Sequence, residues 1–321
     1  MLPREIIQRV REIQVHTGRQ VADVLAGQYV SVFKGRGIEF DEVRPYVPGD
    51  DVRTIDWNVT ARTGEPFVKR YVEERQLTLM VMADVSASQD FGSVNRSKRE
   101  ATAELAALLA FSATRNDDKV GLTLFHGNID QYIPPRKGQK HSLRVVREVL
   151  AHGNVETKAK RVDSPRRRRW LPLGRRRAWW RTGHQATNIS GAMEFLMSVT
   201  SRKSVCFVIS DFLDDDFLQA MRSANRKHDV IAVLVTDPRE IEIPNVGMIH
   251  AADPETGRID RYDTGAARFR QQIADASAQR IDRLRRAFGS SGIDFIHVDA
   301  SQSVVDPLIR FFRMRTRRMR R

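Results

Sequence analysis

Residues 77–88 read LTLMVMADVSAS, an uninterrupted apolar run followed directly by one acid and two hydroxyl-bearing residues. A short apolar run bounded by polar residues is typical of a strand that is buried on both faces. Residues 205–211, VCFVISD, repeat this pattern and again end in a hydroxyl and an acid. Strands buried on both faces belong to parallel sheets that helices cover, so the two segments predict an α/β fold.

The rest of the sequence after residue 77 alternates between strand and helix patterns. The predicted strands are 77–83, 120–125, 129–133, 205–209, 230–235 and 293–298, with 129–133 antiparallel to the strand before it. The predicted helices are 97–113, 141–150, 189–199, 214–227, 266–288 and one from 304 onward, and 248–251 pairs with 258–262 as a hairpin. This alternation predicts a doubly wound, mostly parallel, Rossmann-like sheet with helices on both faces.

The composition divides the chain into three regions. Residues 1–76 are expected to form an N-terminal helix and a short β-rich extension full of Gly, Pro, Asp and Arg. In that extension we expect Trp57 to be a packing anchor, and buried salt bridges to hold the extension to the main domain. Residues 77–300 are expected to form the α/β domain, with a basic insert at 155–182, and residues 301–321 a C-terminal helix with an Arg-rich tail.

The excess positive charge of the chain, +14 in total, is concentrated in two segments. Residues 155–181 hold eleven Lys and Arg against two acids, and residues 310–321 hold seven Arg and no acid. Three of the four Trp, at positions 170, 179 and 180, lie in the insert. Arg interleaved with Trp suits an anionic membrane or stacked nucleic-acid bases, and a solvated loop is the plain alternative. No known nucleic-acid-binding motif accompanies it, so we expect peripheral contact with an anionic membrane and no specific nucleic acid.

Three further features indicate the compartment. The chain has no apolar stretch of about 18 residues, the length that a membrane-spanning helix requires. Its first residues lack the apolar core of a signal peptide. Its single cysteine, Cys206, lies in an apolar run and is expected to be a buried core thiol. We therefore expect a cytoplasmic protein, with the inner face of the membrane as a place of peripheral contact.

Polar side chains follow both of the strands that decide the fold. Asp84, Ser86 and Ser88 come after the first strand, and Asp211 comes after the second. Thr187 precedes the helix that leads into the second strand. Ligands of open α/β sheets bind beyond the carboxyl ends of the strands, so these five side chains are expected to converge. Two carboxylates and three hydroxyls form an all-oxygen set that suits Mg²⁺ first, with Mn²⁺ or Ca²⁺ as alternatives, and no Cys/His cluster is present for Zn²⁺.

Simpler roles are open to some residues near this set. Thr187 is equally suited to capping the helix that follows it. Residues 214–216 are three consecutive Asp and could hold a second metal, but acids at the start of a helix are the simpler interpretation. His184 is close to Thr187 in the sequence and could approach the metal, although a solvent-facing loop position is favoured for it.

The pattern Asp-x-Ser-x-Ser at 84–88, with Thr187 and Asp211, resembles the metal-ion-dependent adhesion site (MIDAS) of von Willebrand factor A (vWA) domains. The resemblance extends over about residues 77–300 and implies a vWA-like sheet. It implies that the two Ser and the Thr bind the ion directly, while the Asp residues often act through water. Neutral hydroxyls leave the ion strongly electrophilic, so it can accept a carboxylate from another molecule.

Upstream of this pattern the sequence resembles the bacterial DUF58 family, which joins such an extension to a vWA-like domain. The matching segments are GRGIEF at 35–40, EVRPY at 42–46, PGDD at 48–51, IDW at 55–57 and ARTG at 61–64. DUF58 proteins are commonly associated with MoxR-type AAA+ ATPases. The resemblance therefore implies an ATPase of this type as the partner.

The sequence favours a metal-dependent protein–protein interaction module, an adaptor or co-chaperone for a MoxR-type ATPase, over two alternatives. The first alternative is a metal-dependent hydrolase, for which His184 is the one candidate general base. The second is a nucleic-acid-binding protein that uses the basic insert and tail. The chain has no Walker A motif, Gly-x-x-x-x-Gly-Lys-Ser/Thr, so we expect no ATP hydrolysis and no enzyme activity.

Overall fold

The computed structural model describes Glu12 and residues 38–73, 77–94, 96–152, 187–214, 216–252 and 259–319. The predicted N-terminal helix (apart from Glu12), the basic insert with its Trp residues, His184 and the turn of the predicted hairpin lie outside the described residues. Within the described segments, no helix is both long enough and apolar enough to cross a lipid bilayer.

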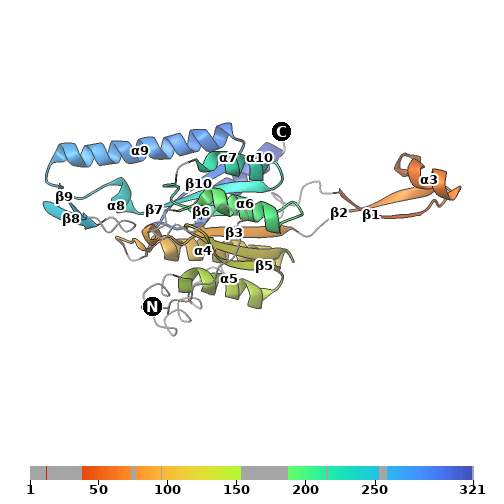
Figure 1. The fold of residues 1–321 in the computed structure, drawn as a ribbon, viewed down its shortest axis with the longest axis horizontal. Coiled ribbons are helices and arrows are strands. Elements are labelled where there is room, and N and C mark those ends of the chain that lie inside the picture. Colours follow the sequence, from red (N-terminus) through yellow and green to blue (C-terminus); the bar gives the residue numbers. More distant parts are fainter. Residues whose placement is uncertain are drawn as a thin grey trace, which may run out of the picture.

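A six-stranded sheet forms the centre of the molecule, in the order β10-β7-β6-β3-β4-β5 (Figure 1). Its strands are β3 (Thr78–Asp84), β4 (Lys119–Phe125), β5 (Ile129–Arg136), β6 (Val205–Ser210), β7 (Asp229–Thr236) and β10 (Asp294–Asp299). All neighbours are parallel except β4 and β5, which are antiparallel. The predicted doubly wound, mostly parallel α/β sheet is therefore confirmed. The chain builds outward from β3 through β4 to β5 and then returns to build β6, β7 and β10, so the strand order reverses between β3 and β6.

Helices cover both faces of the sheet. On one face lie α4 (Lys98–Arg115), α5 (Gln139–Ala151) and α10 (Val305–Met319), and on the other lie α6 (Ile189–Val199), α7 (Phe217–Asn225) and α9 (Ala267–Ser290). Successive residues of a strand point to opposite faces, so Val81 of β3 packs with the first group and Met82 with the second. This two-sided burial explains why β3 is an apolar run without alternation. Cys206 of β6 is a fully buried core thiol, as expected.

The C-terminal helix α10 is part of the core rather than a free basic tail. Phe311 and Phe312 are buried in the cluster that covers one face of the sheet. Arg315 reaches back to the sheet, with two bonds of 2.6 Å to Asp229 and one of 2.6 Å to Asp294. Arg315 is therefore a structural ion-pair partner, whereas Arg313, Arg317 and Arg318 of the same helix are exposed.

Residues 38–73 form an arm that projects from the end of the body at which β3 begins (Figure 1). The arm consists of the antiparallel strands β1 (Ile38–Pro45) and β2 (Phe67–Glu73). The 3₁₀ helix η2 (Val52–Thr54) and the short helix α3 (Trp57–Thr63) lie between them at its tip. The arm is thus the β-rich extension that the sequence predicts, with one short helix added.

One expectation for this arm is wrong, and the described ion pairs do not bear out a second. Trp57 is 70% exposed at the start of α3 and is not a packing anchor. The ion pairs of this segment, Arg44–Asp50 at 2.6 Å and Lys69–Asp56 at 3.4 Å, lie within the arm and do not join it to the α/β domain. The reason is local, because the acids of the segment cap its own turns. The carboxylate of Asp56, for example, accepts hydrogen bonds from two backbone N–H groups at the start of α3.

Three short elements follow β7 at the opposite end of the body. The helix α8 (Pro238–Ile241) is not among the predicted elements and begins with a capping box formed by Asp237 and Glu240. The strands β8 (Met248–Ala252) and β9 (Ile259–Asp263) form the predicted antiparallel hairpin. Figure 1 shows α8 and the hairpin at one end of the body and the arm at the other.

Candidate metal centre

The structure brings the five predicted metal-binding side chains together where the strand order reverses. Asp84 is the last residue of β3, and Ser86 and Ser88 lie just before and within the 3₁₀ helix η3 (Ala87–Asp90). Asp211 follows β6 directly, and Thr187 lies just before α6. Because β3 and β6 are parallel neighbours, their carboxyl ends meet at one edge of the sheet. All five residues are buried, with at most 8% of any of them exposed.

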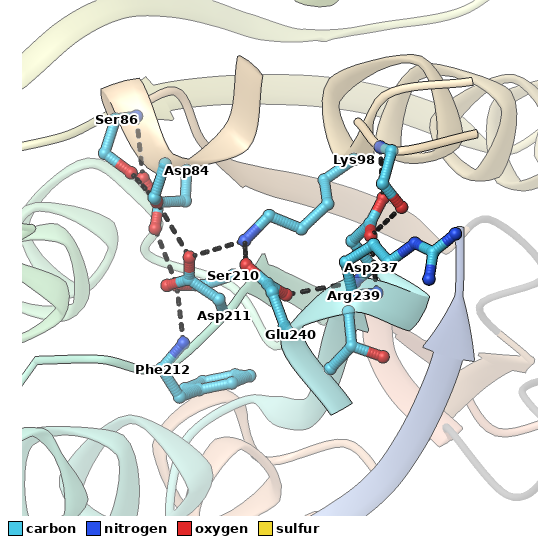
Figure 2. Close-up of polar contacts among 12 residues, drawn as sticks. Asp84, Ser86, Lys98, Ser210, Asp211, Phe212, Asp237, Arg239 and Glu240 are labelled. Carbon is cyan, nitrogen blue, oxygen red and sulfur yellow. Dashed lines mark hydrogen bonds and ion pairs between the residues drawn. The ribbon is translucent and has the colours of Figure 1, made fainter. Parts of the chain in front are cut away.

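Hydrogen bonds hold both carboxylate oxygens of Asp84 (Figure 2). Its Oδ1 accepts from the Ser86 backbone N–H at 2.9 Å. Its Oδ2 accepts from Ser210 Oγ at 2.6 Å and from Thr187 Oγ1 at 3.4 Å. Ser210 is not in the predicted set, although it directly precedes a predicted ligand in the sequence. Its hydroxyl also accepts from the Phe212 backbone N–H at 3.0 Å, so Ser210 orients Asp84 from a fixed position.

Asp211 has one carboxylate oxygen with partners and one without. Its Oδ2 accepts from Ser88 Oγ at 2.7 Å and from Lys98 Nζ at 3.1 Å. Ser88 Oγ is also 3.0 Å from Ser86 Oγ, so the hydroxyls and carboxylates form one connected cluster. The other oxygen, Oδ1, is buried and has no hydrogen-bond partner. A buried polar group left without a partner costs roughly 1–3 kcal/mol, and more when it is charged, so Oδ1 marks a position at which a ligand would be stabilised.

Burial and a neighbouring acid make the ionisation of Asp84 less favourable. Burial raises the pKa of Asp84 to about 6, and the nearby charge of Asp211 adds to the rise. Hydrogen bonds from Ser210 and Ser86 act in the opposite direction without offsetting the effect of burial. A divalent cation held beside Asp84 would favour its ionised form and remove this penalty.

A buried lysine that is not among the predicted site residues lies beside the cluster (Figure 2). Lys98 is the first residue of α4 and is fully buried, with its Nζ 3.1 Å from Asp211 Oδ2 and 2.6 Å from Glu240 Oε1. Burial lowers the pKa of Lys98, but the two carboxylates outweigh burial and leave that pKa above its ordinary value. One signal could have found it. Lys98 directly follows the capping residue Ser97, and the positive end of a helix disfavours a cation unless an acid is near.

The helix α8 fixes the far side of this lysine. Glu240 binds Lys98 through Oε1 and accepts from the Asp237 backbone N–H through Oε2 at 3.0 Å. Asp237 is fully buried and accepts from the Ser93 backbone N–H at 2.8 Å. Ser277 of α9 donates to the Glu240 carbonyl at 2.7 Å. Glu240 is therefore held on several sides, and the position of the Lys98 ammonium is set with it.

The surrounding loops bear on two simpler interpretations, that Thr187 caps a helix and that residues 214–216 are acids at the start of one. Asn188, and not Thr187, caps α6, because its Oδ1 accepts from a backbone N–H of the first turn at 2.8 Å. Asp214 accepts from the Ile189 backbone N–H at 2.8 Å and supports the start of α6. Asp216 precedes α7 but makes no capping hydrogen bond with its side chain. The interpretation of 214–216 as acids at the start of the following helix therefore holds for Asp216, the N-cap residue of α7, whereas Asp214 lies at the start of α6 instead.

The donor set fits a hard divalent ion such as Mg²⁺. All of its side-chain donor atoms are oxygens, two of its residues are acids, and one buried carboxylate oxygen lacks a partner. Oxygen donors of this kind suit Mg²⁺, Mn²⁺ or Ca²⁺ and not Zn²⁺. Across the described segments, no group of three or more His, Cys, Asp or Glu is placed to hold a metal. The candidate centre differs from such groups because hydroxyls supply most of its donors.

Comparison with protein families decides where the chain belongs. The model of a family described as "Protein of unknown function DUF58" matches residues 42–283. The chain belongs to the DUF58 family. The matched range begins in β1 of the arm and includes all five candidate metal ligands. The resemblance seen in the segments between residues 35 and 64 is thereby confirmed at the level of the family.

Relatives of this DUF58 protein occur in mycobacteria. The uncharacterized proteins Rv1480 of Mycobacterium tuberculosis and Mb1516 of Mycobacterium bovis are each 27% identical to it over 309 residues, or 96% of this chain and 89% of each relative. Among solved structures, BatB from Bacteroides thetaiotaomicron is 15% identical, with a TM-score of 0.39 over 75% of this chain and 99% of that one. The SpRpn10 VWA domain is 12% identical, with a TM-score of 0.36 over 73% of this chain and 94% of that one. The strand order, rather than these likenesses, establishes the fold.

Proposed function

We propose that this DUF58 protein is a metal-dependent protein-interaction module that acts by binding and not by catalysis. One divalent ion, Mg²⁺ by preference, would be held by Asp84, Ser86, Ser88, Thr187 and Asp211. The ion would take an acidic side chain of a partner protein as a further ligand. The observation that carries the proposal is Asp211 Oδ1, a buried carboxylate oxygen without a partner inside an all-oxygen cluster.

The chemistry of the cluster favours binding a ligand over catalysing a reaction of it. Three of the five donors are neutral hydroxyls, so a bound ion keeps most of its charge and attracts a carboxylate. A hydrolase would need a general base within hydrogen-bond reach of the reacting atoms. Within the described ranges, the hydrogen bonds of the cluster involve carboxylates, hydroxyls, backbone amides and Lys98, and no histidine.

We propose a MoxR-type AAA+ ATPase as the partner, which this chain would serve as an adaptor or co-chaperone. Membership of DUF58, together with the family's usual association with such ATPases, supports this choice. The arm and the metal edge lie at opposite ends of the body (Figure 1). A partner held at the metal would leave the arm uncovered for a separate contact.

Isothermal titration calorimetry with Mg²⁺ and Mn²⁺ tests the metal site. The wild-type protein is expected to bind one ion per chain. Asp211→Asn is expected to lose at least about tenfold in affinity, or about 1.4 kcal/mol, because an amide replaces the charged ligand. Asp282→Asn makes the same chemical change on a side chain that is 62% exposed, and it is expected to bind like wild type. No binding by the wild type, or equal losses in both variants, would contradict the site.

Co-precipitation with the purified cognate ATPase tests the partner. Capture is expected in Mg²⁺ and is expected to be lost in EDTA and in Asp84→Ala, whose circular dichroism should match that of the wild type. Capture that survives both changes would rule out binding through the metal. Turnover of a phosphatase or nuclease substrate in Mg²⁺ or Mn²⁺, abolished by Asp211→Asn, would establish the hydrolase alternative instead.

A further inference from the structure

Lys98 places a positive charge inside the candidate metal centre, and the proposed function makes no use of it. Its side chain is fully buried, and Figure 2 shows the ammonium between Asp211 and Glu240. The ammonium contacts Oδ2 of Asp211 at 3.1 Å, and the partnerless Oδ1 belongs to the same carboxylate. The lysine and a bound ion would therefore share one ligand.

The acids of the cluster outnumber its single ammonium. Two carboxylates, those of Asp211 and Glu240, contact one ammonium, and a third, that of Asp84, lies near Asp211. A buried ammonium needs compensating acids, and buried acids need a compensating cation, so Lys98 stabilises the cluster when no ion is bound. The same ammonium repels a second cation on the other oxygen of Asp211, and such repulsion is strong where water is excluded.

We propose that Lys98 is a resident countercation, which keeps the centre assembled without an ion and weakens the binding of the ion when it arrives. This inference rests on the proposed metal site. In the metal-free protein, Lys98 gives the charge of Asp211 a partner and fixes the position of the carboxylate. With an ion bound, Lys98 competes for that carboxylate, so the ion stays exchangeable instead of becoming a permanent structural part.

Glu240 has the opposite influence on the ion. Its contact with the ammonium, 2.6 Å, is shorter than that of Asp211, 3.1 Å, so it offsets part of the charge of Lys98. Removing Lys98 leaves Asp211 and Glu240 without this countercation, whereas removing the charge of Glu240 leaves the ammonium to act on Asp211 alone. The two changes should move metal affinity in opposite directions. A merely structural role predicts that both changes loosen the same network and weaken binding.

The test is a Mn²⁺ titration by calorimetry of four proteins: wild type, Lys98→Met, Glu240→Gln and the double variant. Lys98→Met keeps a long apolar side chain and is expected to bind Mn²⁺ at least about tenfold more tightly. The Mn²⁺ affinity of Glu240→Gln is expected to be lower than that of wild type by a factor of about three or more. The affinity of the double variant is expected to lie closer to that of wild type. In EDTA, Lys98→Met is expected to melt at a lower temperature than wild type, and Mn²⁺ is expected to raise its Tm by more.

Each outcome decides the proposal. Binding by Lys98→Met that equals or falls below that of wild type overturns the countercation and leaves the metal site standing. If neither protein binds Mn²⁺, the metal site and the countercation both fail. Binding by Lys98→Met alone would show that Lys98 takes the place of the ion in the natural protein, so the proposed function would be wrong and the countercation right. Should Lys98→Met not fold, unchanged or tighter binding by Glu240→Gln still contradicts the proposal.

Discussion

Asp84 makes the free energy of unfolding depend on pH. Its pKa in the metal-free fold is about 6, against an ordinary value of 3.8, because the carboxyl is buried near a second acid. A pKa that is raised by folding means that the protonated form is favoured in the fold. The stability that this group contributes is therefore fully present below about pH 4 and is lost as the pH rises through about 6. We expect the free energy of unfolding in EDTA to fall by roughly 2–3 kcal/mol across that window because of Asp84.

Urea denaturation in EDTA between pH 4 and pH 7.5 measures this dependence. Other carboxyls titrate in the same range, so the informative quantity is the difference between wild type and Asp84→Asn, which cannot ionise at this position. The wild type is expected to lose more stability than the variant as the pH rises. Identical pH profiles for the two proteins would contradict the raised pKa.

The candidate ligands can be predicted from the sequence, and the long-range partners of their supporting residues cannot. Asp84, Ser86 and Ser88 share one loop, and Asp211 ends the second buried strand, so a local pattern and one rule about strand ends bring them together. Lys98 reaches Asp211 across 113 residues and Glu240 across 142. No periodicity or motif specifies such a contact. It depends on where α4 and α8 pack against the finished sheet.

At the scale of elements, Arg315 fastens α10 to the edge of the sheet. Its guanidinium binds Asp229 of β7 and Asp294 of β10, and all three side chains are largely buried. Arg315→Met should remove the ion-pair partner of Asp229 and leave Asp294 with Arg318 alone, and it should cost roughly 2–4 kcal/mol of unfolding free energy. Arg317→Met is the matched control, since Arg317 is exposed on the same helix, and a change within about 0.5 kcal/mol is expected. Equal urea midpoints for the two variants would mean that α10 is not fastened in this way.

Long elements can be predicted from the sequence more readily than short ones. The buried strands of the sheet lie within a few residues of their predicted positions because an apolar run between polar residues marks both ends. The helices α3 and α8 span too few residues to show a helical period. Each depends instead on a capping acid, Asp56 for α3 and Asp237 for α8, and an isolated Asp in a polar loop has many other roles. Trp57 is exposed and not the expected packing anchor, because the arm has no large core for its side chain to fill.

At the scale of the whole molecule, the arm and the α/β body are built separately. Within the arm, α3 and η2 pack on β2, which pairs with β1. Among the described elements, no extensive contact joins the arm to the helices and strands of the body. The metal centre lies at the carboxyl edge of the sheet, and the arm is attached at the amino end of β3 (Figure 1). The body should therefore unfold as one cooperative unit, while the arm opens on its own.

Truncating one large aromatic side chain in each part tests this separation. Phe312 is 1% exposed in the core of the body, and Trp57 is 70% exposed on the arm. Phe312→Ala is expected to cost about 3–5 kcal/mol, whereas Trp57→Ala should change the unfolding free energy by no more than about 0.5 kcal/mol. Native-state hydrogen exchange of Phe312→Ala should be faster in β3 and β6, whose amides exchange through unfolding of the body, and unchanged in β1 and β2. If exchange in the arm accelerated as much as in the sheet, the two parts would be one cooperative unit, and the opposite ends of the molecule would not be energetically independent.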